Sequence, residues 1–174
     1  MKEIPLLLIG LLCVSCATNQ TSQKYRGVGS RDSKGHPVGS WTLYHWNSSL
    51  FAKGLFKNEN PQGKWEFYDS THTHVADLNF KNGALDGRYR FYYSGFSGAE
   101  SKGKIKTIGS ANAGRLQGAF TRYGPDGNVV VDYLSDGTQI NVVKIGTKEE
   151  AAFQFHADAS YLDTFFRALA SATE

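Results

Sequence analysis

A hexapeptide that recurs four times in the middle of this chain limits the possible fold more than any other sequence feature. It consists of Gly, any residue, an aromatic residue, two further residues and Tyr, and it begins at Gly39, Gly63, Gly87 and Gly118. The aromatic residues are Trp41, Trp65, Tyr89 and Phe120, and the closing residues are Tyr44, Tyr68, Tyr92 and Tyr123. Successive copies begin 24, 24 and 31 residues apart, so the third unit carries an insertion of seven residues. This period predicts a stack of one repeated supersecondary unit.

A second predicted strand follows each of the first two copies. Residues 52–58 (Ala-Lys-Gly-Leu-Phe-Lys-Asn) match residues 76–82 (Ala-Asp-Leu-Asn-Phe-Lys-Asn), each beginning eight residues after a repeat tyrosine. Turn-forming residues close the units, most clearly Asn82-Gly83, because both central residues of a type I′ turn need positive φ. Each unit is therefore predicted to be a β-hairpin, and the hairpins must stack because one alone is marginal in water.

Alternation along the strands assigns side chains to two faces of the predicted sheet. One face takes the apolar positions, which are Trp41, Leu43, Trp65, Phe67, Tyr89 and Phe91. The other face takes Thr42, Glu66 and Arg90 together with Tyr44, Tyr68 and Tyr92. We expect the first face to be buried and to supply most of the stability.

These repeats resemble the MORN-repeat family, and more closely its bacterial variant in YwqK-like antitoxin components. The resemblance rests on the Gly-x-aromatic-x-x-Tyr elements and on the Asn-Gly and Asp-Gly turns, and it covers roughly residues 25–145. It implies an elongated antiparallel sheet of successive hairpins that serves as a binding or scaffolding surface without catalysis. Arg122 replaces the apolar residue of the fourth unit, and the insertion near residues 94–109 breaks the period, so we expect the last units to be irregular.

After the repeats the pattern changes to that of a helix. Residues 128–134 and 140–145 are predicted strands, and residues 147–172 are a predicted amphipathic helix that begins with the capping box Thr147 to Glu150. Its apolar face comprises Ala152, Phe155, Ala159, Leu162, Phe166 and Leu169. A weaker alternative starts the helix at Asp158 and makes residues 151–156 a strand. The predicted fold is thus mainly β, with hairpin repeats over residues 25–146 and a C-terminal capping helix.

The N-terminal residues indicate export and a lipid anchor. Lys2 precedes an apolar run over residues 4–14, as in a signal peptide, and this run is too short to span a bilayer comfortably. Residues 13–16 (Cys-Val-Ser-Cys) resemble a bacterial lipobox, which implies a signal peptide over residues 1–15, acylation of Cys16 and a tether over residues 16–24. Ala17 implies the outer membrane in a Gram-negative cell, at its periplasmic face. An ordinary secretory signal is the alternative.

Three groups of residues are candidate binding sites, each with a structural alternative. Tyr44, Tyr68, Tyr92 and Tyr123 form either a stacking surface for sugars or peptides, or packing between repeats. Trp46 has no counterpart in the other units and has either a functional or a local packing role. Lys102, Lys104 and Lys106 alternate, so an extended segment would place them on one side, either to contact anionic groups or to protect an edge strand.

Catalysis and metal binding find little support in the sequence. No nucleophile elbow, phosphate loop or zinc-helix motif is present, and His72 and His74 lack further ligand residues at useful spacing. A net charge of +3 does not call for nucleic acid. We therefore expect a monomeric, non-catalytic envelope lipoprotein without cofactor or metal, which binds an envelope protein or a cell-wall polymer. An antitoxin or immunity protein is the second hypothesis, and an envelope hydrolase is the third.

Overall fold

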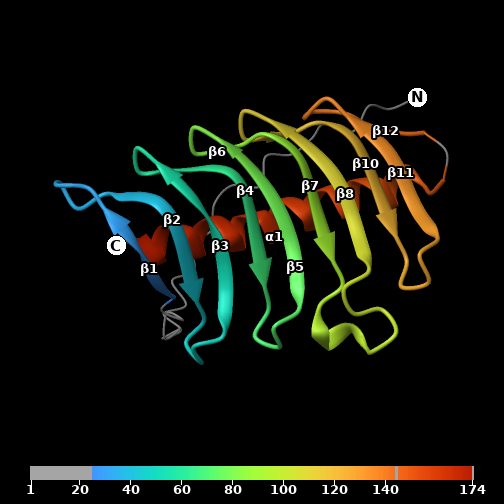
Figure 1. The fold of residues 1–174 in the computed structure, drawn as a ribbon. Coiled ribbons are helices and arrows are strands. Elements are labelled where there is room, and N and C mark those ends of the chain that lie inside the picture. The colour runs from blue at the N-terminus through green and yellow to red at the C-terminus, as the bar shows by residue number, and fades with distance from the viewer. Residues whose placement is uncertain (1–24, 144, 174) are drawn as a thin grey trace, which may run out of the picture.

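The computed structural model describes residues 25–143 and 145–173, which form one open antiparallel sheet, one α-helix and a short 3-10 helix at Gly95–Ser97 (Figure 1). The strands are β1 Arg26–Arg31, β2 Pro37–Tyr44, β3 Leu50–Lys57, β4 Asn60–Tyr68, β5 His74–Lys81, β6 Ala84–Leu85, β7 Gly87–Tyr92, β8 Ile105–Asn112, β9 Arg115–Leu116, β10 Gly118–Tyr123, β11 Val129–Ser135 and β12 Ile140–Val142. Their order is β1-β2-β3-β4-β5-β7-β8-β10-β11-β12, with β6 on β5 and β9 on β8. Helix α1 spans Lys148–Thr173.

This architecture confirms the predicted mainly-β fold of successive hairpins with a C-terminal helix. The predicted helix over residues 147–172 agrees with α1 to one residue at each end, and the alternative start at Asp158 is wrong. The predicted capping box is present, because Thr147 N donates to Glu150 Oε2 at 2.7 Å and Glu150 N donates to Thr147 Oγ1 at 3.2 Å.

The predicted signal peptide, Cys16 and the tether lie outside the described residues. No helix in the described part is long and apolar enough to cross a membrane.

The repeat glycines are required by the backbone at the start of each hairpin. Gly39, Gly63, Gly87 and Gly118 have φ values of 72°, 68°, 92° and 96°, a region that side chains with a Cβ disfavour. At Gly39 and Gly63 an added Cβ would meet nothing within 4 Å, so backbone conformation and not space selects glycine. The first residue of the motif is therefore glycine because of the backbone conformation at that position.

A β-bulge recurs next to each repeat tyrosine. In β2 and β3, for example, Leu43 lies opposite Ala52 but Tyr44 lies opposite Leu50, so Phe51 is an extra residue. The corresponding extra residues of the four hairpins are Phe51, Val75, Lys106 and Val130. Phe51 and Val75 are buried, so the bulge adds a second apolar side chain to the covered face of these units.

The seven-residue insertion lies in the loop between β7 and β8 and leaves the sheet regular. Tyr93 N donates to Lys104 O at 2.9 Å, as Asp69 N donates to Thr73 O at 2.9 Å in the preceding loop. Strands β10 and β11 follow with the same bulge as the earlier hairpins. The expectation that the last units are irregular was wrong, because the added residues extend a loop whose ends are already joined.

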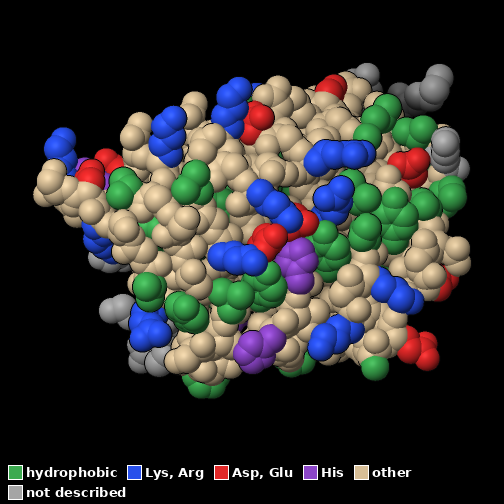
Figure 2. Space-filling view, in the orientation of Figure 1, with side chains coloured by type: hydrophobic (Ala, Val, Ile, Leu, Met, Phe, Trp, Pro, Cys, Tyr) green, Lys and Arg blue, Asp and Glu red, His purple; other side chains and the backbone are tan. Residues whose placement is uncertain are grey.

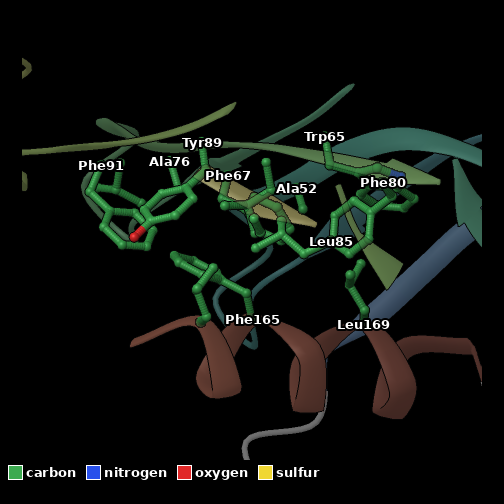
Figure 3. Close-up of a cluster of buried hydrophobic side chains, with 14 of the residues drawn as sticks. Ala52, Trp65, Phe67, Ala76, Phe80, Leu85, Tyr89, Phe91, Phe165 and Leu169 are labelled. Atoms are coloured by element: carbon green, nitrogen blue, oxygen red, sulfur yellow. The ribbon is translucent and has the colours of Figure 1, made fainter. Parts of the chain in front are cut away.

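Helix α1 crosses the sheet on one face and covers the aromatic residues of the repeats (Figures 1 and 3). Phe165 and Leu169 point from α1 toward the sheet, and the ring centroids of Phe165 and Phe67 are 4.5 Å apart. Trp65, Phe67 and Phe91 are at most 1% exposed. The predicted assignment of the apolar repeat positions to a buried face is confirmed.

The stripe of α1 that faces the sheet differs from the predicted one. Ala159 is exposed, and Phe166 is 37% exposed, whereas Phe165 is buried. The buried stripe comprises Ala151, Gln154, Asp158, Leu162, Phe165, Ala168 and Leu169. The prediction is confirmed for Leu162 and Leu169, and Phe155 packs against the core. It was wrong for Ala159 and Phe166, because it followed apolar residues only and two polar residues occupy the buried stripe.

Those two polar residues, Gln154 and Asp158, form a hydrogen bond with each other between α1 and the sheet. Gln154 Nε2 donates to Asp158 Oδ1 at 2.7 Å, and the Tyr89 hydroxyl donates to Asp158 Oδ2 at 3.2 Å. Burial raises the pKa of Asp158 to about 6, although these hydrogen bonds and the charges of Arg122 and Lys106 act in the opposite direction. The ionised carboxylate is thus a destabilising element of the helix–sheet contact at neutral pH.

We predict that Asp158→Asn changes how stability depends on pH. Because the folded pKa of about 6 lies above the ordinary value of 3.8, the folded state binds this proton more tightly than the unfolded state. The wild type should therefore gain about 1–3 kcal/mol relative to the variant as pH falls from about 7 to about 4. Urea unfolding of both proteins across this range measures the difference. An equal difference at both pH values, or a similar trend in the exposed helix variant Asp163→Asn, would contradict the prediction.

The open face of the sheet as a candidate binding surface

The sheet face opposite α1, here called the open face, is covered by no described element and carries charged and hydrophobic side chains side by side (Figures 1 and 2). The repeat tyrosines Tyr44, Tyr68, Tyr92 and Tyr123 are half-buried there, at the ends of β2, β4, β7 and β10. Directly opposite them across the bulge lie Leu50, His74, Ile105 and Val129. These eight residues form a row that crosses the strands, and we call it the tyrosine row.

Neighbouring side chains contact the rings of Tyr44, Tyr68 and Tyr92. The His74 ring lies between those of Tyr68 and Tyr92, with centroid distances of 5.2 and 4.6 Å. Lys53 Nζ lies 5.8 Å from the Tyr68 centroid, and the Arg26 guanidinium lies 5.4 Å from that of Tyr44. These rings therefore pack against their neighbours and present edges and hydroxyl groups, which favours the packing alternative over a free stacking platform.

Beside the tyrosine row lies a network of ion pairs, here called the central polar cluster: Lys53, Lys64, Glu66, Tyr68, His74, Asp77 and Tyr92. Glu66 lies directly opposite Asp77 in the sheet, where two like charges repel each other. Lys64 Nζ bridges them, at 3.0 Å from Glu66 Oε1 and 3.1 Å from Asp77 Oδ1. Lys53 Nζ adds a contact of 2.8 Å to Glu66 Oε2. Hydrogen bonds from Lys53 and Lys64 lower the pKa of Glu66 to about 2.

Asp77 is the buried centre of this cluster. Its side chain is only 7% exposed, and the Tyr92 hydroxyl donates to its Oδ2 at 2.9 Å. His74 Nε2 lies 3.0 Å from its Oδ1, but neither this nitrogen nor Oδ1 has an aligned hydrogen bond, so the contacts at Oδ1 are electrostatic. Burial, followed by the hydrogen bond to Asp77, raises the pKa of Tyr92. Asp77 thus ties β4, β5 and β7 together on the open face.

The three candidate lysines do not share one side. Strand β8 begins only at Ile105, so Lys102 and Lys104 lie in the preceding loop, where Lys104 Nζ donates to Pro125 O at 3.1 Å. Lys106 is the extra residue of a bulge and points toward the helix, 5.8 Å from the Tyr161 ring centroid. The expected extended segment was wrong, and so was the edge strand, because β8 lies between β7 and β10.

The remaining candidates lie in or beside the loops that join strands β2 and β3, β4 and β5, and β7 and β8. Trp46 is 68% exposed in the loop between β2 and β3, and Phe96, which the sequence did not single out, is 74% exposed in the inserted loop. His72 is exposed at a turn, whereas His74 is in the tyrosine row, so the two imidazoles do not alternate along one strand. Among residues 25–143 and 145–173, no three His, Cys, Asp or Glu side chains are placed to hold a metal ion.

The sequence singled out Glu66 as facing the tyrosine side but missed Lys53, Lys64 and Asp77 as its partners. A signal was present, because charged residues alternate with apolar ones in β3, β4 and β5. Which charges meet depends on strand register, which the bulges shift.

Comparison of the chain with models of known protein families and with curated proteins finds no match. The resemblance to MORN repeats therefore stays a prediction.

We predict that Asp77 contributes more to stability than the exposed ion pairs around it. Asp77→Ala should lower the free energy of unfolding by about 1–3 kcal/mol, because it leaves the Tyr92 hydroxyl without its buried acceptor and removes the buried charge that Lys64 contacts. Lys53→Ala should cost less than about 1 kcal/mol, because the Lys53 side chain is 52% exposed. Urea unfolding of the two variants makes the comparison. A larger loss from Lys53→Ala would show that the cluster is not organised around Asp77.

Proposed function

We propose that this protein is a non-catalytic, lipid-anchored binding module of the bacterial envelope, and that its open face holds the partner. The observation that carries this proposal is that the two faces of the sheet differ in what covers them. One face is packed under α1, whereas no described element covers the other, which displays the tyrosine row and the central polar cluster.

The chemistry of the open face favours binding over catalysis. Glu66 is held by Lys53 and Lys64, and Asp77 by Lys64, His74 and Tyr92, so the carboxylates are engaged by neighbouring side chains. The tyrosine row lies on eight paired strands, which form a rigid platform and so limit the conformational entropy lost on association. The anchor through Cys16 is supported by the lipobox-like residues 13–16.

Photo-crosslinking in cells tests the proposed binding face. A photoreactive phenylalanine placed at Thr42, which lies beside Lys53 on the open face, should give adducts with an envelope component. The same group at Asp163, which is 56% exposed on α1, should give none. Adducts from position 163 alone, or the same adducts from both positions, would refute an open-face binding site.

The same strains test the anchor. Cys16→Ala should remove palmitate label and shift the protein out of the membrane fraction, and adducts from position 42 should decrease with it. Label and membrane association that persist in Cys16→Ala would contradict the lipoprotein assignment. Adducts that persist without the anchor would still support the binding face.

A further inference from the structure

Two arginines lie side by side on the open face without an acidic partner. Arg88 and Arg90 are two residues apart on β7, so their side chains leave the same face of the sheet, about 7 Å apart. Arg88 lies opposite Ser110 of β8, and Arg90 lies between Asp77 of β5 and Ile108 of β8. Within residues 25–143 and 145–173, neither guanidinium forms a salt bridge or a side-chain hydrogen bond.

The acidic groups nearby are already occupied. Lys53 and Lys64 hold Glu66, and Lys64 also contacts Asp77, whose other oxygen accepts from Tyr92. This part of the open face therefore has four cationic side chains for two carboxylates. Arg88 and Arg90 account for the excess of positive charge, and Figure 2 shows basic side chains outnumbering acidic ones across this face.

The surroundings of Arg88 suit a hydrated ligand better than a protein. The core of a protein interface is rich in apolar and aromatic groups and in Arg, but poor in Lys, Asp and Glu. Here the row through Arg88 contains Lys64, Asn79 and Ser110. Next to it, the hydroxyl-bearing residues Ser40 and Thr42 border a shallow hollow together with Lys53, Lys64 and Glu66. Hydroxyl, amide and charged groups on an open sheet face are complementary to sugar hydroxyls and acidic substituents.

We propose that the open face binds an acidic polysaccharide, whose negatively charged groups are held by Arg88 and Arg90. A guanidinium offers a planar fork of donors that matches a carboxylate in two hydrogen bonds. Lys64 lies two strands from Arg88, about 10 Å away at the usual strand spacing, so a chain that crosses the strands meets successive cations. This inference rests on the proposed function only in taking the open face as the binding face.

Binding of the full-length protein to polygalacturonate tests the inference, with dextran as the neutral probe. Binding to polygalacturonate should weaken as salt is added, because screening acts on exposed charges, and dextran should not bind. The double variant Arg88→Gln/Arg90→Gln should weaken it by at least about tenfold, since hydrogen bonds to charged groups are lost. Arg88→Lys/Arg90→Lys should give an intermediate loss of affinity, because the positive charge remains but the planar guanidinium that donates two parallel hydrogen bonds is lost.

The control variant Lys148→Gln/Arg167→Gln removes the same charge from α1 and should bind as the wild type does. An equal loss in this control would show attraction by net charge alone and overturn the inference. Stronger binding to poly-L-glutamate than to polygalacturonate would overturn it in favour of an acidic protein. Failure to bind either probe, with crosslinked adducts from Thr42 intact, would reject the polysaccharide and leave the proposed binding face standing.

Discussion

The packing of α1 against one face of the sheet is the interaction on which the rest of the structure depends. A twelve-stranded open sheet has two faces, and one helix can bury only one of them. The repeats place their aromatic residues on that face, where Phe165 meets Phe67 and Phe91. Because this contact supplies an apolar core, the other face is free to carry polar side chains that a doubly covered sheet would exclude.

Two backbone devices keep the faces distinct over the whole sheet. A glycine with positive φ lies at or near the start of each repeat strand and a bulge lies at its end, so the hairpins share one backbone pattern. The bulge turns Phe51 and Val75 into the core while Tyr44 and Tyr68 stay on the open face. A slip by one residue would exchange the faces, and the repeated bulge guards against it.

The sequence alone predicted the hairpins, the faces of the repeat residues and the helix, because these follow from short periodic patterns. It did not predict the bulges, since an extra residue leaves no periodic mark, and this is why Lys106 was placed with Lys102 and Lys104. It also missed the role of Asp158, because a buried carboxylate is recognisable only from its contacts with Gln154 and Tyr89. The central polar cluster depends on which strands are neighbours, which only the fold supplies.

Hydroxyl-radical footprinting of the full-length protein tests most directly the claim that α1 closes one face and leaves the other open. Phe67 and Tyr68, like Phe91 and Tyr92, are adjacent in the chain but lie on opposite faces, so each pair is its own control. If α1 covers only one face, Tyr68 and Tyr92 remain reactive relative to the unfolded chain, while Phe67 and Phe91 are protected. Equal protection of both members of a pair would show that the face carrying the tyrosine row is also covered and would contradict the account.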